Sequence, residues 1–160
     1  YCVRFNRISH TRRRNGRMII HPQVLEMIVS IYKPHIYLEL GLCTGVTFNT
    51  IRPLVGRAIG VDIVQKNLEG EIYHCSTDDF FKSFNDKIDM AFIDADRECK
   101  AVLRDLENCL ERLNNGGIIV IHDTDPIRNE LFSLKRCGDS YKIINELEQR
   151  DDINIVTMPV

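Results

Sequence analysis

The stretch Tyr37-Leu38-Glu39-Leu40-Gly41-Leu42-Cys43-Thr44-Gly45 contains the features that decide the fold. Residues 36–40 are apolar apart from Glu39, which is typical of a buried strand. Gly41 and Gly45 follow, and glycine lets a backbone turn tightly and approach a ligand. Residues 46–54 then have the pattern of a helix. This order of strand, glycine loop and helix predicts a ligand site, although the glycines could also serve only to shape the turn.

The rest of the chain alternates between strand-like and helix-like segments. Further strands are predicted at 58–62, 71–75, 88–94, 117–122 and 153–158. Helices are predicted at 21–32, 78–84, 99–113 and 140–150, with a short one at 127–134. Residues 114–117, with two glycines, are expected to end a helix and lead into a strand. The alternation predicts a Rossmann-like α/β fold, doubly wound around a mostly parallel sheet with helices on both faces.

Length and charge predict one domain that is preceded by a basic arm. The chain has 160 residues, of which 44% are hydrophobic, enough for one sizeable core. Six of its 21 basic residues are arginines within residues 1–17, which contain no acid, so the remainder has 15 basic and 23 acidic residues. We therefore expect a basic N-terminal arm over residues 1–20 and a domain over 21–160. The arm could contact nucleic acid or an acidic partner, or be a solvated terminus.

The cysteines and the hydropathy pattern indicate the compartment. The six cysteines show no C-x-x-C spacing, so we expect reduced, mostly buried thiols. No apolar run approaches the roughly 20 residues of a membrane span, and no secretory signal follows the arginine-rich start. We expect a soluble, cytoplasmic protein without membrane contact.

The acids at the strand ends distinguish between nucleotide cofactors. The second predicted strand of the core ends in Asp62, whose carboxylate can accept hydrogen bonds from a ribose diol. The third glycine of a dinucleotide fingerprint is absent. Glu39 would repel a pyrophosphate but would attract a cofactor with a sulfonium and an ammonium group. This pattern disfavours a nicotinamide-dependent oxidoreductase.

Several segments together resemble a known family. Residues 36–123 resemble the class I S-adenosylmethionine-dependent methyltransferases, and most closely the group of catechol O-methyltransferase-like and sugar and antibiotic O-methyltransferases. The matching segments are Tyr37-Leu38-Glu39-Leu40-Gly41, Gly60-Val61-Asp62, Ser76-Thr77-Asp78-Asp79-Phe80-Phe81, Asp89-Met90-Ala91-Phe92-Ile93-Asp94-Ala95-Asp96 and Gly116-Gly117-Ile118-Ile119-Val120-Ile121-His122-Asp123.

The resemblance implies a set of cofactor-binding residues. Glu39 and Gly41 would border the methionine half, and Thr47 would reach its carboxylate. Asp62 would hold the ribose hydroxyls, and Ile63 would pack on the adenine. The complete set is Glu39, Gly41, Cys43, Gly45, Thr47, Asp62, Ile63, Ser76, Thr77, Asp78 and Asp94. Ser76, Thr77 and Asp78 would lie at the adenine edge, although they could equally form an ordinary helix start.

A cluster of acids is expected where two neighbouring strands end. Asp94 ends one strand and His122 and Asp123 end the next, and carboxylates that meet there favour a bound cation. Relatives hold a divalent cation at the positions of Asp94 and Asp123, where it orients the acceptor hydroxyl. Magnesium rarely accepts a histidine ligand, whereas manganese or iron tolerates one. A metal site made of Asp94, His122 and Asp123 and a metal-free site both remain open. Without a metal, Asp123 would cap a turn and His122 would be a core histidine.

Arg97 departs from the pattern of the resemblance. Relatives place a lysine or histidine there to accept the acceptor's proton, but an arginine is effectively never a base. Arg97 could instead stabilise an oxyanion, bind an acidic acceptor, or lie on a solvated helix face. The catalytic candidates are therefore Asp96, Arg97 and His122.

We expect an S-adenosylmethionine-dependent enzyme that methylates a hydroxyl of a small molecule, with or without Mg or Mn. The alternatives are a nucleic-acid methyltransferase that uses the basic arm, or a cofactor-binding scaffold with a decayed site. The strand at 153–158 would be the sixth of a sheet that has seven in this family, and the chain begins at Tyr1. We therefore expect an abbreviated fold or a fragment, and an open strand edge that could pair in a homodimer.

Overall fold

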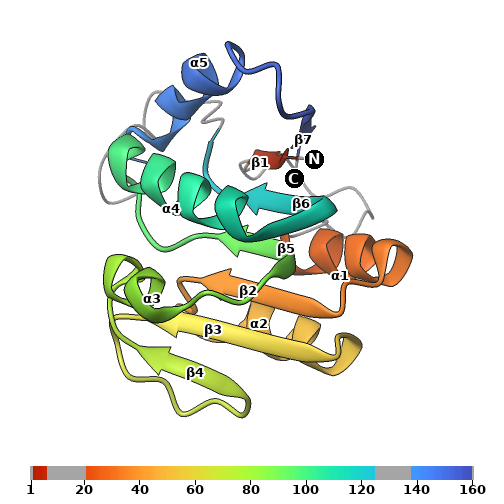
Figure 1. Cartoon of the computed structure of the whole chain (residues 1–160). Coiled ribbons are helices and arrows are strands. Elements are labelled where there is room, and N and C mark those ends of the chain that lie inside the picture. Colours follow the sequence, from red (N-terminus) through yellow and green to blue (C-terminus); the bar gives the residue numbers. More distant parts are fainter. Residues whose placement is uncertain (1, 7–20, 125–137, 160) are drawn as a thin grey trace, which may run out of the picture.

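The computed structural model describes residues 2–6, 21–124 and 138–159, which form one parallel sheet covered by helices (Figure 1). The described strands are β1 (Cys2–Asn6), β2 (Ile36–Leu40), β3 (Arg57–Asp62), β4 (Glu71–His74), β5 (Ile88–Ile93), β6 (Leu113–Ile121) and β7 (Ile155–Pro159). Their order in the sheet is β4-β3-β2-β5-β6-β1-β7, and each described pairing is parallel. The predicted Rossmann-like, doubly wound architecture is confirmed.

Two apolar clusters, one on each face of the sheet, hold the helices in place. On one face, α3 (Thr77–Ser83), α4 (Cys99–Arg112) and α5 (Ile143–Leu147) pack their buried side chains against β2, β3, β5 and β6. On the other face, α1 (His21–Tyr32) and α2 (Val46–Ile51) cover the sheet. Strand side chains alternate between the two clusters, as a buried parallel strand requires. Among the described helices, none has the length and apolarity needed to cross a membrane.

Two predicted elements differ in detail. The helical segment predicted at 46–54 ends as α2 at Ile51 and continues as the 3-10 turn η1 (Arg52–Leu54), which contains a proline. The helix predicted at 140–150 divides into the 3-10 turn η3 (Ser140–Lys142) and the short α5. The short helix predicted at 127–134 lies outside the described residues.

The strand predicted at 117–122 begins earlier than expected. β6 starts at Leu113, and Asn114–Gly117 belong to this strand instead of forming a separate turn. Gly116 has a positive φ of 78°, and the pairing of β6 with β5 shifts register between Ile88 and Met90. The glycines therefore produce an irregularity within the strand, which is a common alternative to a turn.

The N-terminal residues have a structural role that the sequence did not predict. Cys2–Asn6 form β1, which pairs in parallel with β6 on one side and β7 on the other. β1 therefore fills the position where the resemblance implied a missing antiparallel strand. The predicted arm over residues 1–20 consequently includes a strand of the domain sheet. Local sequence gave no signal for β1 because a five-residue strand with an arginine and an asparagine gains its stability from distant partners.

Candidate active site

A pocket of about 410 Å³ lies at the carboxyl ends of the central strands. The strand order reverses between β2 and β5, and ligands of open α/β sheets bind at this switch point. Most of the predicted cofactor residues line the pocket: Gly41, Cys43, Asp62, Ile63, Ser76, Thr77, Asp78 and Asp94. A hollow of similar size, about 400 Å³, lies near the start of β6 and is lined by none of the predicted site residues.

The glycine loop passes very close to the end of β5. Gly41 has a φ of 87°, and a Cβ atom there would lie 2.4 Å from the carbonyl oxygen of Asp94 and 2.6 Å from the Cα of Ala95. Only glycine satisfies both the backbone angle and this close approach. Gly45 has a φ of 76°, and its missing side chain makes room for Leu68. Cys43 also has a positive φ, 46°, so the loop has three left-handed positions.

Glu39 is a buried acid beneath this loop. Its side chain is 1% exposed, and the hydroxyl of the fully buried Tyr37 donates a 2.6 Å hydrogen bond to its Oε2. Burial raises the pKa of Glu39 to about 8, although the hydrogen bonds from Tyr37 and from the backbone of Phe48 oppose the rise. A buried, protonated carboxyl group would ionise readily beside a cationic ligand. Thr47, at the start of α2, is also buried.

Asp62 holds the glycine loop from the end of β3. Its Oδ2 accepts hydrogen bonds from the backbone N–H groups of Leu42 at 2.9 Å and Cys43 at 3.1 Å, and its Oδ1 accepts one from Val64 at 2.7 Å. Burial raises the pKa of Asp62, but these bonds and the nearby ammonium of Lys66 outweigh it and hold the pKa below its ordinary value. Lys66 also lines the pocket, and the sequence analysis did not identify it.

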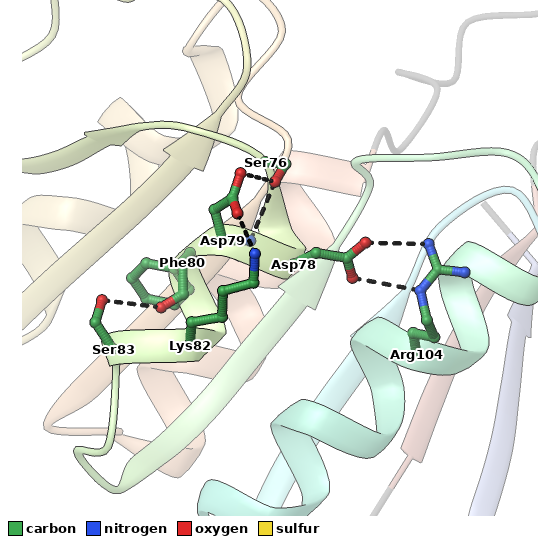
Figure 2. A network of polar contacts seen from close by, with 7 residues as sticks. All are labelled: Ser76, Asp78, Asp79, Phe80, Lys82, Ser83 and Arg104. Atoms are coloured by element: carbon green, nitrogen blue, oxygen red, sulfur yellow. Dashed lines mark hydrogen bonds and ion pairs between the residues drawn. The ribbon is translucent and has the colours of Figure 1, made fainter.

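The predicted adenine edge lies at the start of α3, shown in Figure 2. Ser76 is the N-cap of α3 and accepts a hydrogen bond from the backbone of Asp79. Asp78 faces Arg104 of α4 at 3.3 Å and 3.5 Å. Ile63 is 72% exposed, although it is a large apolar side chain at the pocket wall. The same residues therefore form both the start of α3 and part of the pocket wall.

Asp94, His122 and Asp123 come together at the ends of β5 and β6. One potential ligand atom from each lies within 4.8 Å of the others. Nδ1 of His122 is 3.2 Å from Oδ1 of Asp94 and 3.4 Å from Oδ1 of Asp123, without the alignment of a hydrogen bond. Burial lowers the pKa of His122, but its contacts with Asp123 and Asp94 outweigh burial and raise the pKa to about 10.

The other two catalytic candidates lie beside this cluster. Arg97 is half exposed, and its Nε lies 3.8 Å from Oδ2 of Asp123. Oδ1 of Asp96 accepts the backbone N–H groups of Arg97 at 2.6 Å and Glu98 at 2.8 Å, so this carboxylate shapes the turn into α4. A local structural role therefore accounts for Asp96, and Oδ2 is its remaining oxygen for other chemistry.

His21 is a neighbour of the cluster that the sequence analysis missed. It is the first residue of α1, and its ring centroid lies 4.6 Å from that of His122 in an edge-on contact. The same ring stacks on Phe92 at 6.0 Å. Because His21 and His122 are far apart in the sequence, only the fold brings these two rings together.

The residues fit both groups that the resemblance implies. For the cofactor, the pocket combines a close-approach glycine with a carboxylate at the end of β3, and the buried acid Glu39 lies beneath the glycine loop without lining the pocket. For a metal, two carboxylates and an imidazole present their atoms to a common point, and His122 Nδ1 is a buried nitrogen without an aligned hydrogen bond. One nitrogen and two oxygen donors suit manganese, iron or zinc better than magnesium.

Comparisons with known proteins agree with this geometry. A family model described as a methyltransferase domain matches residues 38–124, more than half of the chain. No curated protein sequence gives a significant match.

Solved structures show the same fold at low sequence identity. The SAH-bound methyltransferase PaMTH1 of Podospora anserina aligns with a TM-score of 0.69 and 14% identity over 87% of this chain and 73% of its own. A Klebsiella pneumoniae protein provisionally assigned as an O-methyltransferase aligns with a TM-score of 0.66 and 13% identity over 86% of this chain and 71% of its own. An rRNA methylase of Streptococcus thermophilus aligns with a TM-score of 0.61 and 14% identity over 84% of this chain and 83% of its own. From the matched domain and its geometry, the chain belongs to the methyltransferase-domain family and is a class I S-adenosylmethionine-dependent methyltransferase.

Proposed function

We propose that this methyltransferase transfers the methyl group to a hydroxyl oxygen of a small molecule, and that a divalent transition-metal cation held by Asp94, His122 and Asp123 assists the transfer. The observation that supports this proposal most is the cluster of two carboxylates and an imidazole beside the glycine loop. Gly41 packs directly against the backbone of Asp94, so the cluster borders the pocket where the reactive end of the cofactor would lie.

The chain's own groups would bind and orient the cofactor. S-adenosylmethionine supplies an electrophilic methyl group on a sulfonium. Glu39 would ionise and pair with the ammonium of the methionine half, since a buried carboxylate is stabilised by an adjacent positive charge. Asp62 would accept from the ribose, and Ile63 would cover the adenine. These contacts fix the position of the methyl group relative to the acceptor, and positioning supplies much of the rate in such displacements.

The cluster would bind and activate the acceptor. A bound divalent cation lowers the pKa of a hydroxyl group and orients it. An arginine is effectively never a base, so the guanidinium of Arg97 would instead stabilise negative charge on the acceptor. His122 is not the base either, because its raised pKa keeps it protonated at neutral pH or, alternatively, its nitrogen binds the metal. The proposal therefore requires no side-chain base.

A turnover assay tests this proposal. The protein, freed of metal with a chelator, is incubated with S-adenosylmethionine and a panel of catechols, phenols and sugars, and the formation of S-adenosylhomocysteine is measured with and without Mn²⁺. We expect Mn²⁺ to stimulate turnover of at least one acceptor, and Asp123→Asn to remove the stimulation. Equal turnover with the chelator and with Mn²⁺ would contradict the metal assignment. Turnover of RNA alone would contradict the small-molecule acceptor.

A nucleic-acid acceptor is the second candidate, because the arginines of the first 17 residues supply positive charge that could neutralise phosphates. The structural likeness to an rRNA methylase concerns the fold alone. Removing the whole arm would delete β1 from the sheet, so the test should be a quadruple substitution of Arg12, Arg13, Arg14 and Arg17 by glutamine. Salt-sensitive RNA binding that this variant loses would support the second candidate.

A homodimer is a further proposal about partners. β7 lies at the edge of the described sheet, and an unpaired edge strand can pair with a second copy of the chain. Light scattering coupled to size exclusion would report the mass, and a monomer at micromolar concentration would contradict this proposal.

A further inference from the structure

Asp62 has little capacity left to accept hydrogen bonds from a ribose. A carboxylate offers about four acceptor positions on two oxygens. Backbone N–H groups of Leu42 and Cys43 occupy Oδ2, and that of Val64 occupies one position on Oδ1. One position therefore remains, on Oδ1. A ribose diol carries two hydroxyl groups, so this carboxylate cannot accept from both of them while it holds the loop.

Lys66 supplies hydrogen-bond donors next to this carboxylate. Its Nζ donates to the carbonyl oxygen of Cys43 at 2.6 Å and lies 3.5 Å from Oδ2 of Asp62. An ammonium group has three donors, so at least one more is available beyond these two contacts. The side chain of Lys66 is 18% exposed and lines the same pocket as Asp62. A positive donor therefore lies beside the carboxylate at the end of β3.

The chain around Lys66 keeps it in this place. Residues 63–70 connect the parallel strands β3 and β4 without a helix. Leu68 packs where a side chain at Gly45 would lie, and Lys66 bonds to Cys43, so this segment contacts the glycine loop at two points. The loop and the segment together fix the ammonium relative to Asp62.

We propose that Lys66 is a cofactor-contacting residue that donates a hydrogen bond to the oxygen of one ribose hydroxyl, whereas Oδ1 of Asp62 accepts from the other hydroxyl. The ribose is then recognised by one donor and one acceptor instead of a single carboxylate that accepts twice. This inference rests on the cofactor placement given under the proposed function.

Calorimetric titration with three ligands tests the inference. The ligands are S-adenosylhomocysteine and its 2′-deoxy and 3′-deoxy analogues, and the variants are Lys66→Met and Lys66→Arg. Lys100→Met is the matched control, because Lys100 is an exposed lysine that does not line the pocket. Lys66→Met should weaken the binding of S-adenosylhomocysteine about tenfold, which is the effect expected for the loss of one hydrogen bond from a charged donor. The variant should bind one deoxy analogue as well as the wild type does, and the other about tenfold more weakly.

The analogues separate contact from support of the loop. If Lys66 only holds the segment in place, Lys66→Met weakens the binding of all three ligands by the same factor, and the inference is overturned. It is also overturned if the variant binds S-adenosylhomocysteine like the wild type. Lys66→Arg, which keeps a charged donor, should retain the sensitivity to both hydroxyls even if Lys66→Met unfolds. Absence of S-adenosylhomocysteine binding by the wild-type protein would instead overturn the cofactor placement itself, and this inference with it.

Discussion

The two halves of the candidate active site are built in different ways. The cofactor half, at the ends of β2 and β3, consists of a glycine loop whose backbone N–H groups are bonded to Asp62. The acceptor half, at the ends of β5 and β6, consists of ionisable side chains that face one another: Asp94, Arg97, His122 and Asp123. The first half is preorganised by the backbone, and the second is held by opposing charges.

This difference indicates which half depends on added ligands. Backbone N–H groups and a close-approach glycine do not titrate, and the Asp62 carboxylate that accepts from the loop has a pKa held below its ordinary value. The charges of the acceptor half respond to protons and cations, and the raised pKa of His122 reflects two carboxylates that require a positive partner. We therefore expect the cofactor half to bind cofactor even when the acceptor half is disrupted, but we do not expect the acceptor half to function when the cofactor half is disrupted.

Gly41→Ala should disrupt the cofactor half most severely. The added Cβ would meet the backbone of Asp94 and Ala95 and would also strain a φ of 87°. We expect a loss of about 3 kcal/mol or more in the free energy of unfolding and no measurable binding of S-adenosylhomocysteine. Gly116→Ala is the control, since Gly116 has a φ of 78° but no atom within 4 Å of the added Cβ. It should cost only about 1 kcal/mol. Equal losses in the two variants would contradict the close-approach argument.

Asp123→Asn should disrupt the acceptor half. Removing one of two carboxylates lowers the affinity for a divalent cation, and we expect turnover to fall about hundredfold while cofactor binding persists.

In the wild type, affinity for Mn²⁺ should rise with pH, up to about tenfold per unit, because binding displaces the proton that His122 keeps up to a pKa of about 10. Isothermal titration between pH 6 and 8 measures this slope. A pH-independent affinity would count against His122 as a ligand.

Glu39→Gln should change the pH dependence of the cofactor half. Cofactor binding ionises a carboxyl group whose pKa is about 8, so wild-type binding should release a proton at pH 7 and weaken as the pH falls. The variant should bind about tenfold more weakly at pH 8 and release no proton at this site. Titrations in two buffers of different ionisation enthalpy measure the release. Equal proton release by both proteins would contradict the role of Glu39.

Glu39 also changes how stability depends on pH, in the direction opposite to that of a carboxylate whose pKa is lowered by folding. The pKa of Glu39 is higher in the folded protein than its ordinary value of 4.5, so its contribution to stability is complete below that value and is lost as the pH rises toward 8. Without cofactor, Glu39→Gln should therefore gain in thermal stability relative to wild type between pH 5 and 8. A difference in melting temperature that stays constant over this range would contradict the raised pKa.

Arg104→Met should have the smallest effect. Arg104 and Asp78 form an exposed ion pair, with 56% and 54% of their side chains accessible, and such pairs contribute little to stability (Figure 2). We expect the melting temperature to stay within about 2 °C of wild type and S-adenosylhomocysteine to bind within about threefold. A tenfold loss of affinity would show that the pair belongs to the adenine site rather than to the surface.

In both halves, the sequence predicted which residues lie at the strand ends, but not the residues that reach the site from other elements. Glu39, Gly41 and Asp62 could be placed because they lie at the ends of strands whose apolar pattern is strong, and the ends of parallel strands meet at one edge. His21 and Lys66 could not be placed, since each reaches the site through a helix start or a loop whose path depends on tertiary packing. β1 was missed for the same reason, because its partners β6 and β7 are distant in the sequence. Protonation of His122 could not be read from residue types alone.

Two titrations of the wild-type protein and His122→Asn test the independence of the two halves most directly. S-adenosylhomocysteine is titrated into each protein in the presence of a chelator, and Mn²⁺ is then titrated into each protein after the chelator has been removed. We predict dissociation constants for S-adenosylhomocysteine within about threefold of each other, and Mn²⁺ binding by the wild type alone. A loss of S-adenosylhomocysteine binding in His122→Asn would contradict the independence of the two halves, and unchanged Mn²⁺ binding by that variant would contradict His122 as a ligand.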